Sequence, residues 1–201
     1  LTPLLVASQA PNVWALFVFV AIVLAATGVI ARLRDWKPLM AGAFTGAGLW
    51  CLFYLAIESA PDVVVVTFVN AVMLAVMVFV WLRRDEAEPR ADVPAGFATT
   101  FVALASVSLV TGATGEPTNA MAVAALLLLG VLASTLYRQA AYAGLFAAGI
   151  AALICYLHIG LGGSFEISLF GEVVTIEGTR PGIASGQARL WGAVLALAFL
   201  A

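Results

Sequence analysis

The sequence predicts an all-α membrane protein, a polytopic bundle of about seven transmembrane helices forming a single domain over residues 1–201. The first reason is composition: 64% of the 201 residues are hydrophobic and 10% are charged, whereas soluble domains carry about 25% charged residues. The second reason is a pair of apolar runs between Lys37 and Arg84, each about twenty residues long. Helices of that length span the roughly 30 Å hydrocarbon core of a bilayer. We therefore expect a multi-pass protein of the cell membrane.

The two apolar runs, at 38–58 and 62–82, are predicted to form a helical hairpin. They meet in the turn 58–62, where Pro61 interrupts the pattern because proline lacks the backbone donor that a continuing helix needs. An earlier apolar run at 13–31 is followed directly by basic residues and is predicted to be the first span. These three spans are the clearest in the chain.

Four later spans are predicted at 95–110, 120–136, 140–159 and 185–201. The first of these four is the most polar, with hydroxyl side chains at Thr99, Thr100, Ser106 and Ser108. In an ordinary buried helix such hydroxyls bond to carbonyls of their own helix. The chain starts at Leu1 and ends in an apolar run without a polar flank. We therefore expect the protein to be trimmed at its start and to continue beyond Ala201.

The loop between the last two spans is predicted to hold a short β-hairpin. Residues 165–178 alternate apolar and polar side chains on either side of Gly171 and Glu172, which is the pattern of two paired strands. We expect this hairpin to lie outside the membrane on the extracellular side, because of the orientation that the basic residues predict.

Basic residues gather in the loops after the first, third and fifth spans: Arg32, Arg34, Lys37, Arg83, Arg84, Arg90 and Arg138. These loops share one side of the membrane, and the positive-inside rule places that side in the cytoplasm. The amino terminus, the 58–62 turn and the β-hairpin then face outward. Arg180 and Arg189 fall on the side that the rule does not predict.

Several classes of function lack the residues that they need. A net charge of −2 and the absence of a basic cluster argue against nucleic acid as a partner. No CxxC, His/Cys metal spacing, GxSxG or phosphate loop occurs, so we predict no catalytic residue, no metal site and no cofactor. Cys51 and Cys155 fall inside separate apolar runs and are expected to be small buried hydrophobic residues. The late spans contain no deep lysine, which argues against a retinal Schiff base.

Small residues predict where helices pack closely. In lipid, helices associate through small side chains that let the backbones approach. Gly42 and Gly46 have the GxxxG spacing, and Ala140, Gly144 and Ala148 recur at four-residue steps. The pattern leaves open whether the partner helix belongs to this chain or to another.

Four polar residues near or within the spans are candidates for an ion path, since ionisable and polar groups are costly in lipid. Glu58 and Asp62 flank the outer turn, and either form a solvated turn or attract cations to an entrance. His158, near the outer end of its span, either caps the helix at the interface or relays protons. Asn70, in the third span, either makes an interhelical hydrogen bond or binds a transported ion.

The hairpin resembles small membrane-arm subunits of complex I, group 4 hydrogenases and Mrp-type cation/proton antiporters. The resemblance covers about residues 17–84. The turn 60–63, Ala-Pro-Asp-Val, is similar to that of the MbhD-like domain, and the run 68–73 is similar to the aromatic-x-Gly-Ala-Val-Met run of the complex I J-type chain. The order of spans resembles hydrogenase component E. The family glycine is replaced by Asn70, and the mid-membrane glutamates of the K-type chains have no counterpart.

The resemblance implies a subunit of a multi-subunit ion-translocating complex, which packs beside larger antiporter-like subunits and seals or lines a proton or cation path. The expected partners are the lipid bilayer and the other membrane subunits. One alternative is a seven-span sensory or ligand-binding module, which Trp50 and Glu58 also suit. A small self-contained transporter or channel is the other alternative.

Overall fold

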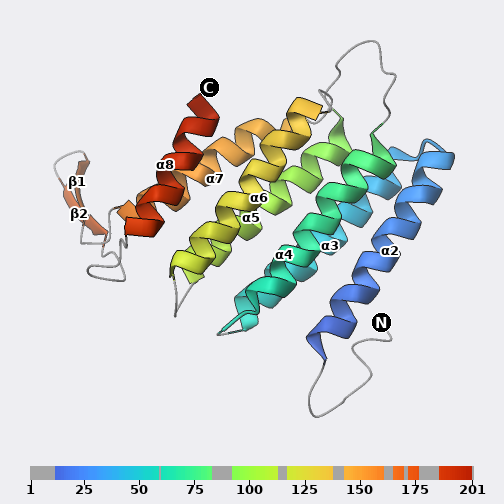
Figure 1. Cartoon of the computed structure of the whole chain (residues 1–201), viewed down its shortest axis with the longest axis horizontal. Coiled ribbons are helices and arrows are strands. Elements are labelled where there is room, and N and C mark those ends of the chain that lie inside the picture. The colour runs from blue at the N-terminus through green and yellow to red at the C-terminus, as the bar shows by residue number, and fades with distance from the viewer. Residues whose placement is uncertain are drawn as a thin grey trace.

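A computed structural model describes residues 12–58, 60–82, 92–112, 117–137, 143–160, 165–169, 172–176 and 186–200. Seven helical segments follow one another in this part of the chain (Figure 1). They are α2 (Val13–Leu33), α3 (Lys37–Ile57), α4 (Val63–Ala75) with its continuation η1 (Val76–Trp81), α5 (Val93–Gly112), α6 (Pro117–Tyr137), α7 (Ala143–Gly160) and α8 (Gly186–Leu200). The predicted helical architecture is therefore confirmed for the described spans.

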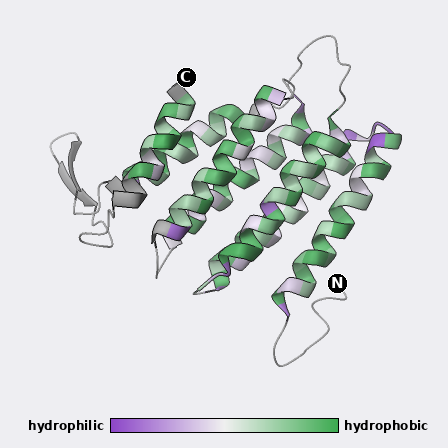
Figure 2. Cartoon of the chain, in the orientation of Figure 1, coloured by the Kyte–Doolittle hydropathy of each residue, from purple (hydrophilic) through white to green (hydrophobic). Residues whose placement is uncertain are grey.

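Five helices are long and apolar enough to cross a membrane: α2, α3, α4 with η1, α5 and α6. The predicted sixth and seventh spans form α7 and α8, whose apolar stretches, Gly144–His158 and Leu190–Phe199, are shorter. Apolar residues run along the helices and polar residues gather towards their ends (Figure 2). Five crossings are thus supported by length and composition, and the crossings of α7 and α8 stay predictions.

The helices lie in two layers, and successive helices alternate between them (Figure 1). One layer runs α2, α4 with η1, α6, α8, and the other runs α3, α5, α7. Each helix runs in the opposite direction to the one before it, so neighbours within a layer run in the same direction (Figure 1). In this arrangement α5 packs against α3, α4, α6 and α7 and is the central helix of the bundle.

Side chains near the helix ends position the first turns. Asn12 caps α2 by accepting a bond from the Ala15 amide at 3.3 Å, as side-chain oxygens do for the orphan donors of a helix start. Asp92 plays the same part for α5, accepting from the Ala95 amide at 2.9 Å and from the Trp81 indole at 2.8 Å. Asp92 therefore ties the end of η1 to the start of α5.

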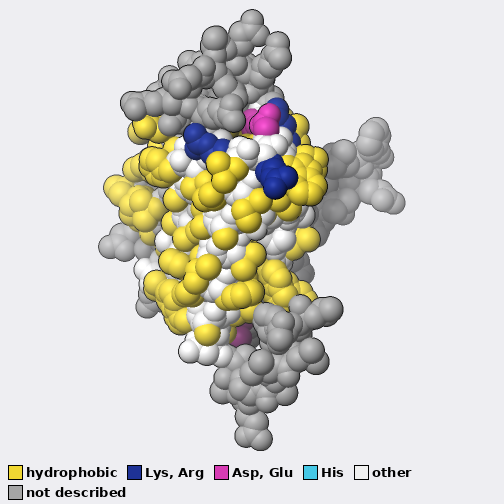
Figure 3. Space-filling view, turned by 90° about the vertical axis from the view of Figure 1, so that its right-hand side faces the viewer, with side chains coloured by type: hydrophobic (Ala, Val, Ile, Leu, Met, Phe, Trp, Pro, Cys, Tyr) yellow, Lys and Arg dark blue, Asp and Glu magenta, His cyan; other side chains and the backbone are white. Residues whose placement is uncertain are grey.

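The connection from α2 to α3 is a tight turn at Arg34–Trp36. Asp35 has a φ of 50°, a left-handed conformation that aspartate tolerates better than most residues. The Trp36 amide donates to the Ala31 carbonyl at 2.8 Å, and Pro38 lies in the first turn of α3, where its missing donor costs nothing. Figure 3 shows Lys and Arg side chains, with an acidic side chain beside them, gathered at one end of a largely apolar face.

The third span does not remain α-helical, because its last six residues form the π-helix η1. The Leu82 amide bonds to the Met77 carbonyl at 2.9 Å, one residue further back than in an α-helix. The end of such a segment leaves carbonyls without backbone donors. Arg32 of α2 fills this need, since its Nη1 donates to the carbonyls of Phe79 and Val80.

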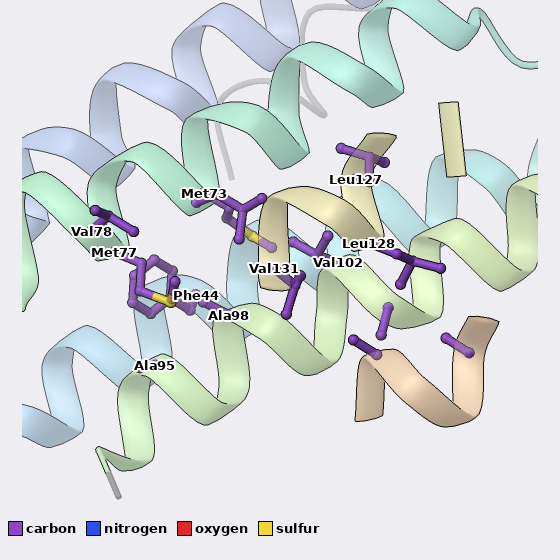
Figure 4. Close-up of a cluster of buried hydrophobic side chains, with 14 of the residues drawn as sticks. Phe44, Met73, Met77, Val78, Ala95, Ala98, Val102, Leu127, Leu128 and Val131 are labelled. Carbon is purple, nitrogen blue, oxygen red and sulfur yellow. The ribbon is translucent and has the colours of Figure 1, made fainter. Parts of the chain in front are cut away.

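The buried core lies between the two layers. Phe44 of α3 and Met77 of η1 belong to its main cluster, together with side chains of α4, α5 and α6 (Figure 4). A smaller cluster around Phe17, Cys51 and Val66 lies towards the 58–62 turn. Large apolar side chains also cover the outside, as expected for a bundle whose surroundings are lipid and not water.

Two short strands lie between α7 and α8, in the stretch for which alternation predicts a hairpin. β1 (Phe165–Leu169) pairs antiparallel with β2 (Glu172–Ile176), with Phe165 opposite Ile176 and Leu169 opposite Glu172. The side of the membrane on which this pair lies stays a prediction.

Glycines let α5 approach both of its neighbours in the layer formed by α3, α5 and α7. At Gly48 of α3 a Cβ atom would overlap the ring of Phe101, and at Gly144 of α7 it would overlap the side chain of Thr99. Thr99 and Phe101 are two residues apart, which is about 200° around a helix. The two close contacts are therefore on opposite sides of α5.

Replacing Gly144 by leucine is expected to lower the free energy of unfolding by about 1–3 kcal/mol, because the added side chain must displace Thr99 or separate α7 from α5. Gly42→Leu is the matched control, since nothing lies within 4 Å of a Cβ atom there. Chemical denaturation in detergent, followed by tryptophan fluorescence, compares the two. Equal stability of both variants would show that α7 does not pack closely on α5 at this point.

Candidate functional site

The turn between α3 and α4 holds Glu58 and Asp62, and it gives Asp62 a structural role. The Asp62 carboxylate accepts a bond from the Val64 amide at 2.8 Å and caps α4. Its own amide donates to the hydroxyl of Tyr54 at 2.8 Å. Glu58 follows the last residue of α3 and is exposed. The pair therefore lies at the rim of the bundle, with one carboxylate engaged in starting a helix.

Asn70 is the most unusual polar residue of the described spans. It is fully buried, with 0% exposure. Its Nδ2 donates to the Val66 carbonyl at 2.8 Å and reaches the Cys51 sulfur of α3 at 3.5 Å. Its Oδ1 has no partner among the described residues. A buried acceptor left without a partner costs about 1–3 kcal/mol, so Asn70 links α3 to α4 at an energetic cost.

The structure does not bring the four predicted ion-path residues together. Asn70 lies eight residues after Asp62, which is about 12 Å along α4. His158 lies in the last turn of α7 and is exposed. Because α7 packs mainly against α5, α6 and α8, His158 belongs to a different part of the bundle from the turn that joins α3 and α4.

The remaining buried polar side chains are satisfied within their own helices. In α5, Thr99 donates to the Ala95 carbonyl at 2.8 Å and Ser106 to the Val102 carbonyl at 2.9 Å. In α6, Ser134 and Thr135 donate to carbonyls three or four residues earlier. The buried set among the described residues contains no charged side chain. These spans therefore offer no chain of ionisable groups across the bundle.

No group of His, Cys, Asp and Glu in the described parts of the chain could hold a metal ion. Cys51 and Cys155 are both buried and free, on α3 and α7. Cys155 directs its thiol towards the Ser106 carbonyl at 3.9 Å. Both cysteines thus act as small core residues, in keeping with their positions inside apolar runs.

The predicted packing residues divide into two groups. Gly144 contacts α5, and Ala148 is fully buried, whereas Ala140 lies outside the described residues. Gly42 and Gly46 make no close helix contact, since nothing lies within 4 Å of a Cβ atom at either position. They line an open groove of about 450 Å³ between α2 and α3, together with Phe19, Val23 and Trp50. The GxxxG pair thus faces outward from the chain.

Sequence reasoning missed a second open groove, between α4 with η1 and α6. Its volume is about 590 Å³, and it runs from Thr67 to Phe79 on one side and from Leu126 to Tyr137 on the other. The signal was present in the small residues Ala71 and Ala75, which recur at a helical spacing. Finding the groove from sequence would have required knowing that α4 and α6 are neighbours in one layer.

Asn70→Leu is expected to change the free energy of unfolding by less than about 1 kcal/mol, because it removes the unpaired Oδ1 together with the bonds from Nδ2. Asn70→Asp places a carboxylate at the same buried position and is expected to cost about 3 kcal/mol or more. Thermal unfolding of both variants in detergent measures the difference. A large loss in the leucine variant would show that the Asn70 amide has a stabilising role beyond these contacts.

Comparisons with known proteins correct the resemblance to complex I, hydrogenase and Mrp subunits. A family model described as "Predicted membrane protein (DUF2339)" matches residues 1–199. This match includes all of 17–84, and nothing links the chain to those subunits, so that resemblance is wrong. Short runs of Ala, Val and Phe recur in unrelated membrane helices, which explains the likeness. No curated protein and no solved structure matches the chain. The chain belongs to the DUF2339 family of predicted membrane proteins.

Proposed function

We propose that the chain is a helix-packing module within a larger membrane assembly of the cell membrane, where it presents the α2–α3 groove to a helix of another subunit. The observation that carries this proposal is the outward-facing pair Gly42 and Gly46, where no atom of the described residues lies within 4 Å of a Cβ position. Small residues on an open face let a second helix approach its backbone closely in lipid. Trp50 and Phe19, which also line the groove, supply apolar walls for such a helix.

The interior of the bundle supports packing over transport by this chain alone. Its described spans bury no charged side chain, and the hydroxyls of Thr99 and Ser106 are directed back to their own helix. A channel or transporter needs polar groups that face a shared path. The ion-translocating part of the sequence interpretation depended on a resemblance that the family match overturned, so the proposal is limited to assembly.

A binding module is the second candidate, and the groove between α4 and α6 favours it. The groove is lined almost wholly by apolar residues, which is typical of sites for hydrocarbon ligands. The two candidates use different grooves and do not exclude each other.

The proposal includes an orientation, with the 34–36 turn in the cytoplasm and the 58–62 turn outside. In a variant without Cys51 and Cys155, a single cysteine at position 58 is expected to react with an impermeant thiol reagent in intact cells. A cysteine at position 37 is expected to react only after the cells are opened. Both positions are exposed, so reaction at 37 and protection at 58 would show the inverse orientation.

Gly46→Leu is expected to release partner subunits during blue native electrophoresis of detergent-solubilised membranes, because the new side chain fills the groove where the partner helix packs. The matched control is Gly112→Leu, which also has nothing within 4 Å but lies at the end of α5. The folded chain alone should keep its stability in both variants. A wild-type chain that migrates as a single copy, or a Gly46→Leu variant that assembles normally, would contradict the proposal.

A further inference from the structure

The groove between α4 with η1 and α6 is apolar and open to the outside of the bundle. Its lining includes small residues from both sides, with Ala71 and Ala75 on one helix and Gly130 and Ala133 on the other. The larger side chains of Leu126 and Phe79 form parts of its walls. Twelve residues separate Thr67 from Phe79, so the groove is about 18 Å long.

The residues that line the groove favour a hydrocarbon ligand. Its two aliphatic hydroxyl groups are already used, since Thr67 donates to the Val63 carbonyl and Ser134 to the Gly130 carbonyl, both at 2.7 Å. No charged residue lines it. Half of the hydrocarbon core of a bilayer is about 15 Å thick, which is close to the length of the groove. One acyl chain of one leaflet therefore matches the groove in both length and polarity.

The end of the groove at Phe79 adjoins a second hollow that is cationic. This hollow has a volume of about 600 Å³ and is lined by Val29, Arg32, Leu33, Phe79 and Val80. Phe79, which is 70% exposed, belongs to both linings and packs on Tyr137 with a centroid distance of 6.3 Å. The apolar groove and the cationic hollow thus lie on either side of one shared aromatic side chain.

Arg32 is held in place while part of its guanidinium stays available. Its Nη1 donates to the Phe79 and Val80 carbonyls at the end of η1, and its Nε and Nη2 bond to none of the described residues. A planar guanidinium with two donor nitrogens left is suited to a phosphate oxygen pair. Arg34 and Lys37 follow in the next turn and add positive charge to the same end of the bundle.

We propose that these two features form a binding site for one anionic phospholipid, with its phosphate on Arg32 and an acyl chain in the groove between α4 and α6. Charge complementarity favours this occupant over a protein helix, because a basic group lies at the end of a hydrocarbon groove, the level at which lipid headgroups occur. The anionic headgroup supplies the charge that Arg32, Arg34 and Lys37 attract. The site uses neither Gly42 nor Gly46 and is independent of the assembly proposed above.

Native mass spectrometry of the full chain in mild detergent tests the site by titration with phosphatidylglycerol and, separately, phosphatidylcholine carrying the same acyl chains. The wild-type protein should bind phosphatidylglycerol more tightly. Arg32→Gln should weaken this binding about fivefold, the effect of roughly 1 kcal/mol per basic residue near anionic lipid. Arg34→Gln, which removes a charge outside both linings, should have a smaller effect.

A second variant tests the acyl groove without touching Arg32. Ala75→Phe places a large side chain in the lining of the groove and should abolish tight binding of phosphatidylglycerol. Ala26→Phe, an exposed alanine on α2 outside every groove described here, should leave it unchanged. Equal binding of the two lipids by the wild-type chain would overturn the proposal, as would undiminished binding in Ala75→Phe. Co-purification of a second protein that Ala75→Phe displaces would also overturn it and assign the groove to a helix.

Discussion

The absence of water from the hydrocarbon core of a bilayer is the constraint on which the rest of this structure depends. A backbone or side-chain polar group in that region must find its partner inside the protein. The five long helices meet this requirement along their length, and hydroxyls such as those of Thr99 and Ser106 meet it by bonding to their own helix. Where the backbone departs from the α-helix, at η1, the departure is compensated by Arg32. Asn70 is the exception among the described residues, with one acceptor left over.

The same constraint explains why small residues decide the packing. Lipid tails are as apolar as leucine, so helices gain little by hiding apolar surface from one another and associate through close contact instead. Gly48 and Gly144 provide that contact on the two sides of α5, and this makes α5 the centre of the bundle. Gly42 and Gly46 face outward instead, so the close approach that their small size allows is open to a surface outside the chain.

Polar and charged side chains are distributed differently in the interior of the bundle and on its outer surface. Its described interior is mostly apolar and buries no charged side chain. On the outside, the described residues form two apolar grooves and one basic end, and these are the features that the proposals assign to a helix and to a lipid. Arg32 links the helix backbone to the outer surface, because its guanidinium both completes the hydrogen bonding of η1 and lines the cationic hollow.

The sequence by itself determined the class of the protein and the approximate bounds of its helices. Long apolar runs, Pro61 in the turn and basic residues after the spans are local signals, and each acts through neighbouring residues of the chain. The same reasoning anticipated that Cys51 and Cys155 are buried and unpaired. It was wrong about the family, because short apolar motifs recur in membrane helices without common descent.

Which residues meet depends on how the helices are arranged in space. The two-layer order makes α4 and α6 neighbours, although a whole helix separates them in the chain, and this order creates the apolar groove between them. The same order leaves Gly42 and Gly46 without a close helix contact, whereas Gly144 packs against α5. Both sets of small residues have the same four-residue spacing, so the sequence does not show this difference. The π-helix at 76–81 and its contact with Arg32 were equally absent from local patterns. The physical reason is that these features depend on which helix faces lie opposite one another, whereas apolar periodicity reports only that a residue is in a helix.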